Sequence, residues 1–165
     1  MGSPIRVLLV DDEERFVLNL AKLLRGRGFE VSTAFDGASG MAAVEKSEGV
    51  DVVLLDVKMP VMDGIETLKR IKEISPETEV LMLTGHATVE TGIAAMREGA
   101  LDYLMKPCDI EDLVAKIREA HEIEDIRRRP VLWPRHVVKE VTWPSFIRLE
   151  IEDSLEKALG VFMRE

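Results

Sequence analysis

Residues 51–74 read DVVLLDVKMPVMDGIETLKRIKEI and contain one complete strand-and-helix unit. The nearly all-apolar run Asp51–Leu55 predicts a buried strand, and the apolar residues of Ile65–Ile74 recur at helical spacing. Ser75-Pro76 ends the predicted helix, because proline does not continue a helix. This stretch sets the pattern with which the rest of the chain is compared.

The same alternation of an apolar strand and an amphipathic helix occurs four more times. The further strands are predicted at Arg6–Val10, Glu30–Ala34, Glu79–Leu83 and Leu101–Met105, and the further helices at 16–24, Ala38–Lys46, Val89–Arg97 and Ile110–Arg128. Strands that are apolar on both faces are typical of a parallel sheet covered by helices on both sides. We therefore expect an α/β fold: a doubly wound five-stranded parallel sheet of the flavodoxin-like (β/α)5 type, with strand order 2-1-3-4-5.

Composition restricts the class of protein further. The 165 residues include 31 acidic and 22 basic side chains, and the net charge of −9 argues against a protein that coats nucleic acid or an anionic membrane. Cys108 is the lone cysteine, which excludes an internal disulfide and a multi-cysteine zinc site. No apolar run approaches the ~20 residues of a membrane span. We expect a cytoplasmic protein with no membrane association and no direct DNA binding.

Polar side chains follow four of the five predicted strands. Asp11 and Asp12 follow the first strand, Asp56 the third, Thr84 the fourth and Lys106 the fifth. Ligands of such sheets bind at the carboxyl ends of the strands, so we expect these side chains to meet there. Clustered carboxylates repel unless a cation lies between them, and oxygen-only ligands favour Mg²⁺. Together with the lysine and the threonine, such a site suits phosphoryl transfer onto a carboxylate.

These residues together resemble the receiver domain of two-component response regulators. The resemblance rests on Asp11-Asp12, on VVLLDVKMPVMDG at 52–64, on Thr84-Gly85 and on YLMKP at 103–107, and it covers roughly residues 5–122. It implies that Asp56 accepts a phosphoryl group from a phosphohistidine on a sensor histidine kinase or a phosphotransfer protein. It implies a phosphoacceptor switch rather than an enzyme, with at most self-phosphorylation and self-dephosphorylation.

The resemblance also implies how the site is built. Asp12 and Asp56 would hold Mg²⁺ together with the backbone carbonyl of Lys58, and Asp11 would act through the waters of the metal. Lys106 would pair with the phosphoryl oxygens. The ligand set is therefore expected to combine side-chain and backbone oxygens.

The resemblance also implies that phosphorylation triggers a switch, which acts through Thr84 and Tyr103. Thr84 would be drawn toward the phosphoryl group, and Tyr103 would rotate into the vacated space. This would change the face of the fourth helix, fifth strand and fifth helix, where such domains dimerise or dock a partner. The side chains of Lys58 and His86 would tune the attack of water on the acyl phosphate, and the peptide bond before Pro107 would be cis.

Other interpretations stay open. The pair Asp11-Asp12 could merely cap the first helix, and Tyr103 could simply pack in the core. Asp63-Gly64 is more typical of a turn and a helix start than of a ligand. As a whole, the chain could be an Mg²⁺-dependent aspartyl phosphatase of the haloacid-dehalogenase type. That family needs an acidic residue two positions after the nucleophile, where this chain has Lys58. A pseudo-receiver that serves only as an interaction module is the other alternative.

The C-terminal part gives weaker signals. Residues 123–130 are predicted to extend the last helix and form a linker, and 131–165 form a short C-terminal extension. Residues 146–151 alternate like a strand, and an amphipathic helix is predicted from Asp153. This part weakly resembles the first strand and helix of a CBS-type module and is too short for a DNA-binding output domain. The chain is then either a fragment of a longer regulator, with a truncated output module, or a receiver whose tail is a small docking or dimerisation element.

Overall fold

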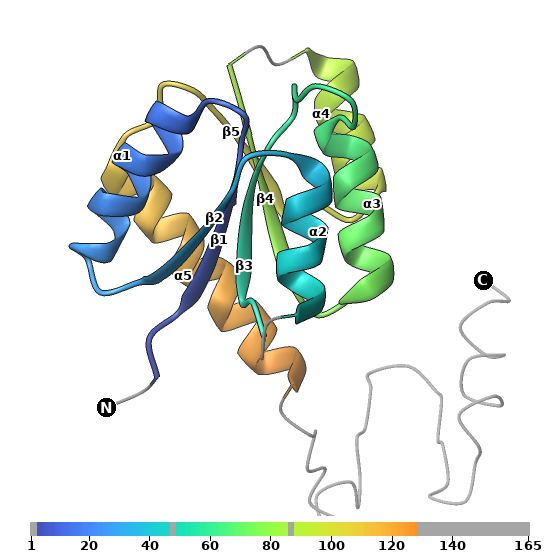
Figure 1. Ribbon diagram of the computed structural model, residues 1–165. Helices are drawn as coiled ribbons and strands as arrows, with labels where there is room; N and C mark the ends of the chain where they lie inside the picture. The colour runs from blue at the N-terminus through green and yellow to red at the C-terminus, as the bar shows by residue number, and fades with distance from the viewer. Residues whose placement is uncertain (1–2, 47–48, 86–87, 129–165) are drawn as a thin grey trace, which may run out of the picture. The chain divides into compact units, whose positions relative to one another are not determined.

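Five parallel strands and five helices alternate in the part of the chain that the computed structural model describes, residues 3–46, 49–85 and 88–128 (Figure 1). The elements are β1 (Arg6–Val10), α1 (Glu14–Arg25), β2 (Glu30–Ala34), α2 (Gly37–Lys46), β3 (Val52–Asp56), α3 (Gly64–Ile74), β4 (Glu79–Thr84), α4 (Val89–Arg97), β5 (Asp102–Met105) and α5 (Ile110–Arg128). The strand order is β2-β1-β3-β4-β5, and every neighbouring pair is parallel. The predicted flavodoxin-like topology is confirmed.

The ends of several elements differ from the predicted ends by one or two residues. β3 and β4 include Asp56 and Thr84, which pair with Leu83 and Met105. The apolar pattern stops at the first polar side chain, whereas backbone pairing continues through it. Some helices likewise begin before their predicted first apolar residue, at Glu14, Gly37 and Gly64. The apolar pattern detects only apolar side chains, whereas a helix also includes the polar residues and glycines of its first turn. At the other end, Asp51 and Leu101 precede β3 and β5 instead of beginning them, although each amide still bonds to the neighbouring strand.

The sheet separates two apolar cores. Along β1, Val7 and Leu9 face a core completed by α1 and α5, and Leu8 and Val10 face a core completed by α2, α3 and α4. Figure 1 shows these helices on opposite faces of the sheet. Because the strands in the middle of the sheet are buried on both sides, their residues are nearly all apolar. The polar side chains of these strands therefore lie at the two edges of the sheet where the strands begin and end.

The longest described helix is α5, which continues to Arg128 as the sequence predicts. Among the described residues, no helix combines the length and the apolar composition that crossing a bilayer requires. The end of the predicted linker and the strand and helix predicted within 131–165 lie outside the described residues.

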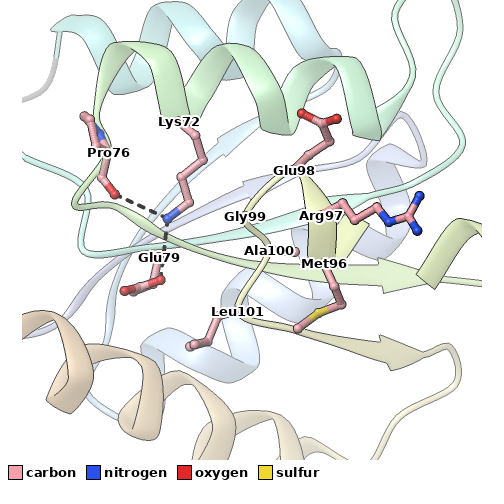
Figure 2. A pocket seen from close by; sticks show the side chains of 9 residues that line it. All are labelled: Lys72, Pro76, Glu79, Met96, Arg97, Glu98, Gly99, Ala100 and Leu101. Atoms are coloured by element: carbon pink, nitrogen blue, oxygen red, sulfur yellow. Dashed lines mark hydrogen bonds and ion pairs between the residues drawn. The ribbon is translucent and has the colours of Figure 1, made fainter. Parts of the chain in front are cut away.

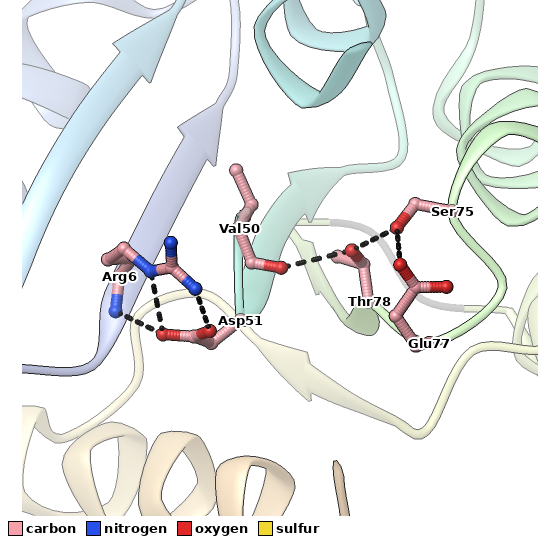
Figure 3. A network of polar contacts seen from close by, with 6 residues as sticks. All are labelled: Arg6, Val50, Asp51, Ser75, Glu77 and Thr78. Atoms are coloured by element: carbon pink, nitrogen blue, oxygen red, sulfur yellow. Dashed lines mark hydrogen bonds and ion pairs between the residues drawn. The ribbon is translucent and has the colours of Figure 1, made fainter. Parts of the chain in front are cut away.

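At the amino end of the sheet, polar groups join the strands (Figure 3). The Asp51 carboxylate accepts hydrogen bonds from the backbone N and the Nη2 of Arg6, both at 2.8 Å. The Thr78 hydroxyl donates to the Val50 carbonyl at 3.0 Å and lies 2.9 Å from the Ser75 hydroxyl. These contacts hold together the starts of β1, β3 and β4.

A second ion pair of this edge lies beside a pocket of about 510 Å³ (Figure 2). Lys72 Nζ is 3.5 Å from Oε2 of the buried Glu79 and donates to the Thr78 carbonyl at 2.7 Å. The pocket is lined by charges of both signs, including Arg97 and Glu98. The Lys72 ammonium therefore already has acceptors within the protein, and this ion pair is a structural contact of the amino edge.

Replacing Asp51 by Asn tests the contribution of this edge to stability. Burial alone raises the pKa of the Asp51 carboxyl, but the hydrogen bonds from Arg6 outweigh it and hold the pKa below the ordinary 3.8. A carboxylate whose pKa is lowered by folding stabilises the fold above its unfolded-state pKa and loses this contribution as the pH falls through its folded-state pKa. We expect Asp51→Asn to lower the free energy of unfolding by about 1–3 kcal/mol at neutral pH in urea titrations.

The pH dependence of this deficit is the sharper part of the test. The deficit should begin to shrink below about pH 4, where the unfolded-state carboxyl takes up a proton, and it should be lost as the pH falls through the lower folded-state pKa of Asp51. Glu122→Gln, at an exposed position of α5, is the control and should change stability by less than about 0.5 kcal/mol. An Asp51→Asn deficit that stays the same from neutral to acidic pH would show that the charge contributes nothing.

The loop between β3 and α3 contains a strained residue. Val61 has a φ of 68°, in the left-handed region, and its side chain is exposed. A β-branched residue is unfavourable there, and the left-handed region costs about 1–2 kcal/mol for a residue with a Cβ. We expect Val61→Asn to raise the free energy of unfolding by about 1 kcal/mol, because asparagine tolerates this region and no packing is lost. Urea titration measures the change. Val61→Thr keeps the branched Cβ and should leave stability unchanged, whereas destabilisation by Asn would contradict this account.

Candidate functional site

The candidate site lies at the carboxyl ends of four strands. Asp11 follows β1, Asp56 is the last residue of β3, Thr84 is the last residue of β4, and Lys106 follows β5. Two backbone hydrogen bonds continue the ladders past the strand ends, from Asp11 N to the Ala34 carbonyl at 3.2 Å and from Lys106 N to the Thr84 carbonyl at 2.7 Å. The polar residues are therefore held by sheet geometry rather than by long loops.

Three aspartates gather at this edge. One carboxylate oxygen each of Asp11, Asp12 and Asp56 lies within 4.8 Å of the others. Asp11 and Asp56 are buried, and Asp12 is exposed, so the cluster opens to solvent on one side. Carboxylates this close repel one another, and their oxygens are the ligands that a hard divalent cation takes in proteins. The cluster thus fits Mg²⁺, which keeps several of its waters when it binds.

Lys106 crosses from β5 to the aspartates. Its Nζ donates to Asp56 Oδ1 at 2.8 Å and also to Asp11 Oδ2. Burial alone lowers the pKa of the Lys106 ammonium, but the hydrogen bonds to both carboxylates outweigh it and raise the pKa above the ordinary value. The peptide bond between Lys106 and Pro107 is cis, as the resemblance to receiver domains implies. The site therefore contains a fixed positive charge in contact with a carboxylate.

Asp56 is held through both of its oxygens. Oδ1 accepts from Lys106, and Oδ2 accepts from the backbone N of Lys58 at 2.9 Å. Burial raises the pKa of the Asp56 carboxyl, the Asp11 charge adds to this, and the contact with Lys106 opposes it without cancelling it. The ionised form is thus incompletely compensated, so a further cation in the cluster would stabilise it.

The start of α3 explains how Asp56 is supported from behind. Asp63 caps the helix through a hydrogen bond from the backbone N of Glu66 at 2.9 Å, and Gly64 N donates to the Val57 carbonyl at 2.8 Å. A Cβ at Gly64 would lie 2.1 Å from the Asp56 carbonyl oxygen. Only glycine permits this approach. The predicted turn and helix start at Asp63-Gly64 is therefore confirmed, and it fixes the backbone of the central aspartate.

The predicted switch residues lie at two places. Thr84 is buried at the end of β4. Tyr103, on β5, packs against the core on the α2–α3–α4 side and lines an open pocket of about 530 Å³ together with Ile93 and Met96 of α4. The structure thus places Thr84 at the carboxyl edge and Tyr103 against α4. Their action as a switch pair stays a prediction.

Lys58 and Asp11 have further contacts at the site. Lys58 contacts Asp56 through its amide, its side chain is exposed, and its carbonyl as a metal ligand stays a prediction. His86 lies outside the described residues. The position before α1 is occupied by Glu13, whose backbone N donates to Asp11 Oδ1 at 2.9 Å. Asp11 therefore supports the start of the helix and also contacts Lys106, so helix capping is not its only contact.

Phe16 belongs to the site although the sequence predicts no site role for it. Its helical spacing indicates one apolar position among several, whereas the structure places its ring under Lys106, with Nζ 4.4 Å from the ring centroid. An aromatic residue in the first helical turn after Asp11-Asp12 was the available signal. Apolar periodicity alone does not reveal which apolar residue faces a charge.

Comparisons with known proteins agree with this geometry. The sequence profile of the response regulator receiver domain matches residues 7–118. The chain is 43% identical over 116 residues to the transcriptional regulatory protein ZraR of Escherichia coli (strain K12), and 43% identical over 118 residues to the transcriptional regulatory protein TrcR of Mycobacterium tuberculosis. The alignments cover 70% and 71% of this chain, but only 26% and 45% of those proteins.

The fold agrees with a solved structure of the same kind. A CheY-like response regulator receiver domain protein from Methanospirillum hungatei JF-1 matches with a TM-score of 0.73 and 32% identity, covering 76% of this chain and 99% of that protein. Fold, site geometry and sequence therefore lead to one family: this chain belongs to the response regulator receiver domains of two-component signalling.

Proposed function

We propose that Asp56 accepts a phosphoryl group from a phosphohistidine in an Mg²⁺-dependent reaction, and that the chain works as a phosphoacceptor switch rather than as an enzyme. The observation that carries this proposal is the position of Lys106 Nζ, 2.8 Å from Asp56 Oδ1 beside two more aspartates. A carboxylate, a fixed ammonium and oxygen ligands for a cation are the groups that phosphoryl transfer onto a carboxylate requires.

In the proposed reaction, an oxygen of Asp56 forms a bond to phosphorus while the bond from phosphorus to the histidine nitrogen of the donor breaks. The electron pair of that bond stays on the departing imidazole, which takes up a proton. Asp12, Asp56 and the Lys58 carbonyl would hold Mg²⁺, with Asp11 acting through its waters, and the bound cation supplies charge neutralisation at the phosphoryl oxygens. Lys106 pairs with one of these oxygens.

The response to phosphorylation is proposed to run from Thr84 to Tyr103. The buried hydroxyl of Thr84 can be drawn to the phosphoryl oxygens, and the Tyr103 ring borders the pocket next to α4. The exposed side chain of Lys58, and His86, are proposed to tune how fast water attacks the acyl phosphate.

The proposed phosphodonor is a sensor histidine kinase or a phosphotransfer protein of the cytoplasm. We propose residues 5–122 as the receiver domain, 123–130 as the end of the last helix and a linker, and 131–165 as a C-terminal extension. The chain spans less than half the length of the ZraR and TrcR relatives that it matches.

Phosphorylation by a small phosphodonor tests the proposed function. We expect the chain to gain the mass of one phosphate on incubation with acetyl phosphate and Mg²⁺, read by intact mass spectrometry, and to gain none when Mg²⁺ is chelated. Asp56→Asn should abolish the adduct. Asp36→Asn is the matched control, because Asp36 follows β2 at the same sheet edge but lies outside the cluster, and asparagine can still accept from Ser39 N.

The outcomes separate the alternatives. An adduct on the Asp56→Asn variant would place the phosphoryl group elsewhere and contradict the proposal. The absence of an adduct on the wild type, with acetyl phosphate hydrolysed only at the background rate, would favour the pseudo-receiver. The absence of an adduct together with rapid donor hydrolysis would favour the aspartyl phosphatase.

Dimerisation through the face of α4, β5 and α5 is proposed as the output of the switch. Ile93 and Met96 of α4 are 48% and 50% exposed beside Tyr103. We expect beryllofluoride with Mg²⁺, a mimic of the phosphoryl group, to raise the sedimentation coefficient toward that of a dimer, and Ile93→Ser to prevent the shift. Leu23→Ser, at a residue of α1 that is also 48% exposed, should leave the shift intact. An unchanged monomer with and without beryllofluoride would contradict this output.

A further inference from the structure

The Lys106 ammonium has a third neighbour in addition to its two carboxylates. Its Nζ lies over the ring of Phe16, 4.4 Å from the ring centroid. An ammonium group has three donors, and here two of them point at Asp11 and Asp56. The negative face of an aromatic ring attracts a cation within about 6 Å, and the attraction strengthens when the cation is removed from water. Only 16% of the Lys106 side chain is exposed.

The position of the Phe16 ring is set by the fold. Phe16 lies in the first turn of α1, shortly after the Asp11-Asp12 pair, and it is partly buried against the apolar core shared by α1 and α5. Its backbone therefore belongs to a helix, and its side chain is packed on one side. The Phe16 ring therefore contacts Lys106 from α1, whereas Asp56 lies at the end of β3.

We propose that Phe16 is a positioning residue for Lys106, which holds the ammonium at the place where it meets the phosphoryl group. This inference rests on the proposed function of Asp56. A cation bound in the cluster, or a phosphoryl group on Asp56, changes the charge of the carboxylates that bind Lys106. The face of a hydrocarbon ring keeps its attraction for the ammonium throughout, because the ring does not titrate and does not bind the metal.

Substitutions at Phe16 can separate the effect of the aromatic face from the effect of an apolar side chain that fills the same space. Phe16→Leu keeps an apolar side chain against the core but removes the aromatic face, and Phe16→Tyr keeps the face. Phe29→Leu is the matched control. Phe29 packs on the same core and lies under a cation, with Arg118 Cζ 5.8 Å from its ring centroid, but it precedes β2 at the opposite end of the sheet.

Two readouts test the proposal. The first is the NMR signal of the Lys106 Hε protons in protein with ¹³C-labelled lysine, identified by its loss in Lys106→Arg. We expect an upfield ring-current shift that disappears in Phe16→Leu and persists in Phe16→Tyr and Phe29→Leu. The second is the rate of Asp56 phosphorylation by acetyl phosphate at saturating Mg²⁺, which should fall about threefold to tenfold in Phe16→Leu and recover in Phe16→Tyr.

The two readouts distinguish the failure of this inference from the failure of the proposed function. A Lys106 shift that is unchanged in Phe16→Leu would overturn the inference, and so would a lost shift with an unchanged phosphorylation rate. An equal loss of rate in Phe29→Leu would also overturn it, because the effect would then reflect packing of the core. If the wild type forms no phosphoryl adduct, the proposed function fails and the inference fails with it.

Discussion

The chemistry of the site depends on the crowding of three carboxylates beside one ammonium at the carboxyl edge of the sheet. Oxygens of Asp11, Asp12 and Asp56 lie within 4.8 Å of one another, and Lys106 is hydrogen-bonded to two of these residues. One positive charge does not compensate three negative charges, so the site favours a further cation. The rest of the fold keeps this arrangement in place: strands buried on both faces end at one edge, and the glycine that starts α3 allows the helix to pack directly behind the central aspartate.

The two ends of β3 show how environment gives one residue type two different roles. Asp51 precedes the strand, and the hydrogen bonds from Arg6 hold its pKa below the ordinary value despite burial. Asp56 ends the strand, and burial raises its pKa despite the contact with Lys106. The first carboxylate is fully engaged by its own partner, which suits a structural role. The second retains uncompensated charge, which suits binding of a cation and of an electrophilic phosphoryl group.

Much of this arrangement could be predicted from the sequence because it follows from local patterns. The repeated alternation of strand and helix patterns identified all five strands, and the polar residues at the ends of the third, fourth and fifth predicted strands identified Asp56, Thr84 and Lys106 as residues of one sheet edge. The pattern did not define the terminal residues, since Asp56 is polar and still pairs as part of β3. It also did not reveal the contact between Phe16 and Lys106, which joins residues far apart in the chain, or the left-handed backbone of Val61. Such features depend on how elements meet in space.

The most direct test of the central claim is to identify which aspartate becomes an acyl phosphate when the phosphoryl group comes from a phosphohistidine donor. Borohydride reduces an aspartyl phosphate to homoserine and leaves free carboxylates intact, so that peptide mass spectrometry can locate the modified residue after transfer in the presence of Mg²⁺. Our account predicts homoserine at position 56 and unmodified aspartates at positions 11 and 12. Homoserine at either of those two positions, or phosphoryl transfer that leaves no borohydride-reducible aspartate, would contradict it.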